Sequence, residues 1–200
     1  PTGTWLPAEA VASFLASVPE KVLVVIDEAY FEYVDEPGYE SFIPQAGKHR
    51  NLIVTRTFSK SYGLAGLRVG YSVSDPQVAD VLNRVRQPFN VNAMALAAAE
   101  AALGDRAHLK KSIEVNRSGM QKLTKAFDEL GIDYIPSAGN FIAARMPKPG
   151  AEIFSALLNE GVIVRPVAEY EMPEFIRVTV GTEEENQRFI EALKKVLDNK

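Results

Sequence analysis

The chain contains no cysteine among its 200 residues. Disulfide bridges, thiolate metal ligands and a cysteine nucleophile are therefore excluded. Histidine is also scarce, since His49 and His108 are the only two. The side chains that carry any catalytic chemistry must be sought among other residue types.

Long apolar runs and an excess of positive charge are lacking as well. The formal net charge is -4, and no run of basic residues suggests a nucleic-acid surface. No apolar stretch approaches the roughly 20 residues that a membrane-spanning helix needs. With 46% hydrophobic residues, the chain can still bury a sizeable core. We therefore expect a globular protein without nucleic-acid or membrane partners.

The segment TFSKSYGLAGLRVGY at 57–71 is the most informative part of the sequence. Its lysine, Lys60, can form a Schiff base with an aldehyde cofactor. The hydroxyls of Thr57 and Ser59 and the guanidinium of Arg68 suit a phosphate group nearby. Pyridoxal phosphate carries both the aldehyde and the phosphate. Taken alone, however, Lys60 fits a solvated surface lysine in a glycine-rich turn better than a cofactor-binding one.

The position of Lys60 favours the functional interpretation. The apolar run 52–54 just before it predicts a buried parallel strand. Ligands in open α/β sheets bind just past the carboxyl ends of such strands. A Walker phosphate loop is excluded here, because its lysine follows the glycines and Lys60 precedes them.

A second candidate site follows another predicted strand, the apolar run 22–26, which leads into Asp27-Glu28-Ala29-Tyr30. Asp27 is placed to pair with a protonated pyridine nitrogen, which would make the cofactor ring an electron sink. Tyr30 either donates to the phenolate oxygen of the ring or is a packing aromatic. A rival hypothesis is a nucleotide-hydrolysing enzyme, with Asp27 binding magnesium and Glu28 acting as the base.

Apolar periodicity in the first half of the chain predicts alternating helices and strands. Such alternation is typical of a parallel sheet covered on both faces. The alanine-rich stretch 93–103 predicts a buried helix. The other predicted elements are a helix over 7–18, strands over 22–26, 51–55 and 68–73, and a helix that begins at Ser74-Asp75-Pro76 and carries an apolar stripe.

The character of the sequence changes near Gly104-Asp105, where a long charged amphipathic helix is predicted over 107–130. We therefore predict two domains, 1–105 and 106–200, the second being a small α+β domain. Gly131 and Gly161 are predicted helix stops. Thr182 and the glutamates after it indicate a capping box rather than a metal site. The remaining predicted elements are strands over 140–145, 162–165 and 175–180 and helices over 151–160 and 182–198.

Five segments together carry a family resemblance that covers essentially the whole chain. They are PTGTW at 1–5, DEAY at 27–30, TFSKSYGLAGLRVGY at 57–71, QPFNVN at 87–92 and IRVTVGTEEEN at 176–186. Their order and spacing resemble the fold-type-I aminotransferases, which depend on pyridoxal phosphate, and most of all the branch that acts on L-histidinol phosphate. The resemblance implies an α/β fold: 1–105 would be part of the large domain, a mostly parallel sheet between helices, and 106–200 the linking helix and small domain.

The resemblance also implies roles for individual residues. Lys60 would carry the cofactor and act as the catalytic acid and base, and Asp27 would hold the pyridine nitrogen. The resemblance further implies that Tyr30 contacts the 3-oxygen of the cofactor. The phosphate would be bound by three residues, which are Thr57, Ser59 and Arg68.

Substrate contacts are implied in both halves of the chain. Arg177, in an Arg-Val-Thr context, would grip the substrate anion, and Arg165 in GVIVRP would be a weaker second anion ligand. A guanidinium fork meets a phosphate or a carboxylate with similar geometry, so one arginine can serve two substrates. Asn90 and Asn140 each face the substrate or serve a structural role such as capping a helix.

The implied function is transamination of L-histidinol phosphate with 2-oxoglutarate, in a cytoplasmic homodimer of the histidine biosynthetic pathway. Threonine-phosphate decarboxylases and aromatic aminotransferases share the same cofactor residues, so both stay open. A non-catalytic sensor domain with this fold is a third alternative.

The opening PTGTW resembles the end of an Asn-Pro-x-x-Pro-Thr-Gly-Thr motif. We therefore expect this chain to lack an N-terminal part that, in the family, supplies an Asn for the 3-oxygen, a ring-stacking aromatic and a glycine-rich helix start. Residues 1–200 alone are accordingly expected to be inactive and prone to self-association, because an incomplete sheet leaves an open edge.

Overall fold

The computed structural model describes residues 1–198 and divides the chain into two compact units. One unit is Leu6–Lys110, and the other combines Pro1–Trp5 with the chain from Lys111 onward. The opening segment is tied to the second unit by a hydrogen bond of 2.9 Å from Ala138 N to Gly3 O. The predicted boundary between a large and a small domain at 105/106 stays a prediction. Within the described part of the chain, no helix has the length and apolarity needed to cross a bilayer.

The first unit contains a three-stranded sheet in the order β1-β2-β3, formed by β1 (Val24–Asp27), β2 (Leu52–Thr57) and β3 (Gly70–Ser74). β1 and β2 are parallel, as predicted, and Asp27 is paired with Thr55. β3 runs antiparallel to β2, which departs from the expectation of a parallel sheet. The connection between them contains only one 3-10 turn, Ala65–Leu67, and no crossover helix that a parallel return would need.

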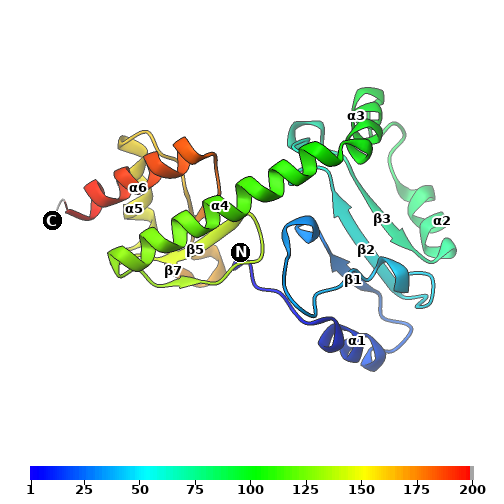
Figure 1. The fold of residues 1–200 in the computed structure, drawn as a ribbon. Coiled ribbons are helices and arrows are strands. Elements are labelled where there is room, and N and C mark those ends of the chain that lie inside the picture. The colour runs from blue at the N-terminus through cyan, green and yellow to red at the C-terminus, as the bar shows by residue number, and fades with distance from the viewer. Residues whose placement is uncertain (199–200) are drawn as a thin grey trace. The chain divides into compact units, whose positions relative to one another are not determined.

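Three helices accompany this sheet: α1 (Ala8–Ser17), α2 (Pro76–Val85) and α3 (Ala93–Gly104). Figure 1 shows α1 beside β1 and α2 beside β3. Leu15 of α1 packs into a buried cluster with Leu52 and Val54 of β2. Both α2 and α3 are less buried than predicted: Val85 of the apolar stripe is 73% exposed, and only Ala95 and Ala99 of α3 are buried.

The second unit is built on a four-stranded antiparallel sheet in the order β4-β5-β7-β6. Its core includes Leu123, Ile142, Ile176 and Leu193, so helices and strands share one apolar face. The predicted strand over 162–165 begins only at Arg165, and β4 was not predicted. The elements are α4 (Arg106–Leu130), which starts in the first unit, β4 (Tyr134–Ile135), β5 (Phe141–Arg145), α5 (Gly150–Asn159), β6 (Arg165–Val167), β7 (Met172–Thr179) and α6 (Glu183–Asp198).

The helix boundaries of this unit follow the predicted local signals. Gly131 and Gly161 adopt left-handed φ values of 65° and 75° just after α4 and α5. Glu185 N donates to Thr182 Oγ1 at 3.3 Å, and Thr182 N donates to Glu185 Oε2 at 2.7 Å. This reciprocal pair is the capping box predicted at the start of α6.

Candidate active site

Lys60 lies in a tight turn that follows β2. The turn is anchored by Phe58, which is 4% exposed and lies against Tyr62 with 5.1 Å between ring centroids. Lys60 itself is half-buried, and its Nζ lies 5.3 Å from the centroid of the Tyr30 ring. At this distance the ammonium is attracted to the ring face. The structure therefore brings together two of the predicted site residues.

The three residues predicted to bind phosphate also contact one another. Ser59 N donates to Thr57 Oγ1 at 3.0 Å, and Arg68 Nη1 donates to Ser59 Oγ at 3.4 Å and to Ala65 O at 2.9 Å. Arg68 has a left-handed φ of 52°, a backbone conformation that costs a non-glycine residue about 1–3 kcal/mol. Two hydroxyls and a guanidinium gathered in this way suit a tetrahedral anion.

Asp27, the last residue of β1, is held by two donors on one oxygen. Ala29 N and Thr55 Oγ1 donate to Oδ1 at 3.1 and 3.2 Å. Within residues 1–198 no group donates to its Oδ2, and the residue is exposed. The carboxylate is therefore oriented by the sheet while one oxygen stays open to a ligand. The sequence analysis did not identify Thr55, whose contact follows from the pairing of β1 with β2.

Behind these residues lies a buried ionic network that the sequence analysis also missed. Glu28 is 2% exposed, and its carboxylate accepts hydrogen bonds from Arg56 Nε at 2.8 Å and from Phe42 N at 2.6 Å. Arg56 also pairs with Glu32 at 3.2 Å, and its guanidinium lies 3.8 Å from the centroid of the Phe31 ring. The available signal was Arg56 itself, a charge in a strand that is otherwise uncharged and begins with three buried apolar residues.

This network argues against the nucleotide-hydrolase hypothesis. A general base must reach the proton that it removes, and Glu28 is buried with both oxygens occupied.

Burial and the negative charges of this network also raise the pKa of two neighbouring tyrosines, Tyr39 and Tyr62. Burial first, and the charge of Glu28 second, raise the pKa of Tyr39. Burial first, and the charge of Glu32 second, raise the pKa of Tyr62, so both phenols stay protonated at neutral pH.

We expect Arg56→Met to destabilise the protein by about 3–5 kcal/mol, because it leaves the buried charge of Glu28 without its partner. Urea denaturation followed by circular dichroism measures the loss in the free energy of unfolding. Adding Glu28→Gln to the same variant removes the stranded charge and should recover part of that loss. A loss below about 1 kcal/mol for Arg56→Met alone would show that Glu28 is solvated.

Arg177 and Arg165 occupy directly opposite positions on β7 and β6. Side chains at such positions lie on the same face of an antiparallel sheet, about 4.5–5.5 Å apart at Cβ, where like charges repel. The guanidinium of Arg177 also lies 4.9 Å from the centroid of the Phe141 ring. Two guanidinium groups on the same face of the sheet favour the binding of an anion between them.

The carboxylate of Glu169 places a negative charge beside Arg165. Arg165 Nη2 donates to Glu169 Oε1 at 2.9 Å, and both side chains are exposed. The hydrogen bond from Arg165 is the main cause that lowers the pKa of Glu169, and the charge of Arg177 lowers it further. The same hydrogen bond raises the pKa of Arg165. The carboxylate thus occupies a position that a substrate anion can take.

The two asparagines have different surroundings. Asn90 is exposed, and its Oδ1 accepts from Arg86 Nη1 at 2.9 Å, while the cap of α3 is Asn92, whose Oδ1 accepts from Ala95 N at 2.8 Å. Asn90 is therefore not the helix cap. Asn140 directly precedes β5 and accepts from Val180 N through its backbone carbonyl at 2.8 Å.

Comparison with known proteins gives a consistent result. The family described as aminotransferase class I and II matches residues 1–193. The chain belongs to this aminotransferase family. Histidinol-phosphate aminotransferase 1 of Nitrosococcus oceani is 56% identical over 99% of this chain and 54% of that protein. Histidinol-phosphate aminotransferase 2 of Pseudomonas fluorescens is 58% identical over 98% of this chain and 53% of that protein.

A solved structure of the same kind shows the fold. The crystal structure of histidinol-phosphate aminotransferase from Sinorhizobium meliloti in complex with pyridoxal-5'-phosphate has a TM-score of 0.88 and is 33% identical. The match covers 99% of this chain and 55% of that one. The chain is thus an aminotransferase chain of the fold-type-I class that spans about half the length of these relatives.

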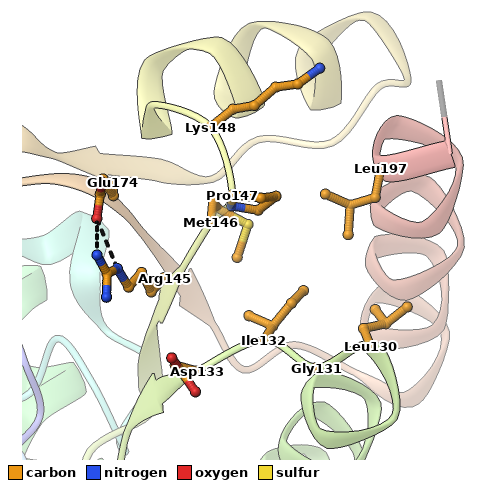
Figure 2. A pocket seen from close by; sticks show the side chains of 10 residues that line it. All are labelled: Leu130, Gly131, Ile132, Asp133, Arg145, Met146, Pro147, Lys148, Glu174 and Leu197. Atoms are coloured by element: carbon orange, nitrogen blue, oxygen red, sulfur yellow. Dashed lines mark hydrogen bonds and ion pairs between the residues drawn. The ribbon is translucent and has the colours of Figure 1, made fainter. Parts of the chain in front are cut away.

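An open pocket of about 780 Å³ in the second unit of this aminotransferase chain contains none of the predicted site residues. Figure 2 shows that Leu130, Ile132 and Leu197 line the pocket. Arg145 and Glu174 also line it, and they are hydrogen-bonded to each other. Arg145 Nη2 lies 2.7 Å from Glu174 Oε2, in an exposed ion pair like that of Arg165 with Glu169. Among the described residues that line the pocket Arg145 is the one arginine, so the pocket lacks the opposed pair that Arg165 and Arg177 form.

Proposed function

We propose that this chain is part of a pyridoxal-phosphate enzyme that transaminates L-histidinol phosphate with 2-oxoglutarate. The observation that carries the proposal is the grouping of Lys60, Asp27 and the hydroxyl and guanidinium cluster past the carboxyl ends of β1 and β2. The names of the relatives support the choice of substrate. Assembly as a homodimer and a cytoplasmic location stay predictions.

The residues present fit pyridoxal phosphate. When bound, this cofactor supplies an aldehyde that reacts with amines and a ring that withdraws electrons. Thr57, Ser59 and Arg68 would hold the phosphate, since they already share hydrogen bonds that an anion can replace. The open Oδ2 of Asp27 would hold the protonated pyridine nitrogen, and Tyr30 would donate to the 3-oxygen.

Lys60 has two roles in this proposal. Its amine would hold the cofactor through the aldehyde and would give way to the amine of a substrate. Its Nζ would then serve as general base and general acid for the proton of the substrate α-carbon. Tyr30 lies beside this nitrogen and limits the directions in which it can turn.

Arg177, with Arg165 as a second ligand, would bind the substrate anion. The phosphate of histidinol phosphate and the carboxylate of 2-oxoglutarate both suit a guanidinium fork. An incoming anion would replace Glu169, whose exposed ion pair with Arg165 is readily exchanged for another. Asn140 and Asn90 are proposed as additional substrate contacts.

An amino-donor screen tests the proposed function. A protein of the relatives' full length that contains this sequence would be given histidinol phosphate, phosphothreonine and aromatic amino acids, with 2-oxoglutarate as acceptor. We expect glutamate to form fastest with histidinol phosphate. Release of carbon dioxide from phosphothreonine would instead identify a decarboxylase, and no turnover with any donor would favour the sensor domain.

Arg177→Lys should weaken both half-reactions together, by about 10- to 100-fold in kcat/KM, because lysine keeps the charge but loses the bidentate fork. Single-turnover measurements with each substrate separate the two halves. Arg145→Lys, on the neighbouring strand of the same sheet, is the matched control and should change neither. A defect confined to one half-reaction would contradict a shared anion site and would assign the other anion to Arg165.

A further inference from the structure

The turn that carries Lys60 is joined to the sheet residue Arg56 through the largely buried carboxylate of Glu32. Its Oε1 accepts from Arg56 Nη1 at 3.2 Å, and its Oε2 accepts from Ser61 Oγ at 3.1 Å. The side chains of Arg56 and Glu32 are each 9% exposed, and Ser61 is 1% exposed. Because these groups are removed from water, each hydrogen bond restrains the segments that it joins more strongly than a surface contact would.

The tie joins the two segments that face each other in the proposed site. Ser61 directly follows Lys60, and Glu32 lies in the 3-10 turn Phe31–Tyr33 that directly follows Tyr30. Lys60 Nζ lies 5.3 Å from the Tyr30 ring centroid. The hydrogen bond between Ser61 and Glu32 therefore joins the lysine segment to the tyrosine segment.

The ion-pair network around Arg56 lies on the opposite face of the sheet from the proposed cofactor ligands. Successive side chains of a strand point to opposite faces, so Arg56 points away from Thr55 and Thr57 on either side of it. Thr55 contacts Asp27 and Thr57 contacts Ser59, whereas Arg56 contacts Glu28, Glu32 and the hydroxyl of Ser41. Any effect of Ser61 and Glu32 on the site would therefore pass through their chain neighbours Lys60 and Tyr30.

We propose that Ser61 is a positioning residue: its hydrogen bond to Glu32 holds the Lys60 turn so that Nζ faces the aldehyde of the bound cofactor. This inference rests on the proposed function. A lysine side chain has four rotatable bonds, and without a fixed turn its amine samples many positions that cannot react. A displacement of about 1 Å in a reacting group can slow a reaction by about 100-fold.

The test compares Ser61→Ala with Ser41→Ala in the full-length protein. Ser41 is the matched control, because its hydroxyl belongs to the same network, between Arg56 and Glu28, but it does not contact the Lys60 turn. Apoprotein is mixed with pyridoxal phosphate, and stopped-flow absorbance follows the rate at which the bond to Lys60 forms. Thermal unfolding of the apoproteins is measured in parallel.

We expect Ser61→Ala to form the bond about 10-fold more slowly and Ser41→Ala to stay within about twofold of the unsubstituted protein. Ser41→Ala should lose at least as much thermal stability as Ser61→Ala, because within residues 1–198 Ser41 Oγ takes part in three hydrogen bonds and Ser61 Oγ in one. Equal rates for the two variants would overturn the positioning role, because the effect would then follow stability alone. If the unsubstituted protein forms no bond that borohydride can trap, the proposed function itself fails.

Glu32→Gln is the conservative variant. Its amide oxygen can accept from Arg56 while its amide nitrogen donates to Ser61 Oγ, so the tie is kept without the charge. We expect bond formation within about threefold of the unsubstituted rate. A Glu32→Gln variant as slow as Ser61→Ala would attribute the effect to the carboxylate charge and would overturn the assignment to the hydrogen bond.

Discussion

Lys60→Ala should abolish transamination, with a loss of at least about 10⁴-fold, because the substitution removes both the amine that carries the cofactor and the group that moves the proton. The visible absorbance of the bond between cofactor and lysine should disappear with it. Absorbance spectra, borohydride trapping and turnover with histidinol phosphate measure these three effects in the full-length protein.

Lys48→Ala is the control for this variant. Lys48 is an exposed lysine of the same unit, and its loss should leave absorbance and turnover unchanged. Peptide mapping after borohydride treatment should find the cofactor on Lys60 and on no other lysine. Cofactor that is still trapped on the protein in Lys60→Ala would refute the assignment.

Asp27→Asn should lower kcat by about 10²- to 10⁴-fold while cofactor binding weakens far less. Asparagine keeps the shape of the side chain and the two hydrogen bonds to Oδ1, but it lacks the charge that keeps the ring nitrogen protonated. Steady-state kinetics and a titration of apoprotein with pyridoxal phosphate separate the two effects.

Asp75→Asn provides the matched substitution at a structural site. Asp75 caps α2 by accepting from Gln77 N at 2.9 Å, and asparagine caps a helix about as well. Turnover and stability should therefore hardly change. Near-normal turnover in Asp27→Asn would show that Asp27 is not the partner of the ring nitrogen.

Structural features that depend on only a few neighbouring residues were predicted well. The hydroxyls and the arginine singled out in 57–68, which are Thr57, Ser59 and Arg68, are joined by hydrogen bonds, while their role in binding phosphate stays a prediction. The stops at Gly131 and Gly161 and the capping box at Thr182 and Glu185 are equally local, and the structure contains all of them. Each depends on backbone conformation or hydrogen bonds within one or two turns of the chain, which a short stretch of sequence determines by itself.

Pairing between distant segments was predicted less well. The antiparallel direction of β3 depends on how residues 58–69 return to the sheet, and the opposition of Arg165 and Arg177 depends on the register of β6 against β7. The ion pairs between Glu28, Arg56 and Glu32 join the loop after β1 to a side chain near the carboxyl end of β2.

The sequence by itself thus determined the family, and it predicted the cofactor chemistry and the lysine proposed to perform it, because these follow from residue types at short spacing. Only the tertiary structure decided that Glu28 is a buried partner of Arg56 rather than a base, and that Ser61 ties the Lys60 turn to Glu32. The physical reason is that a charge can be buried only beside its partner, and the partner is brought there by the pairing of strands that lie far apart in the chain.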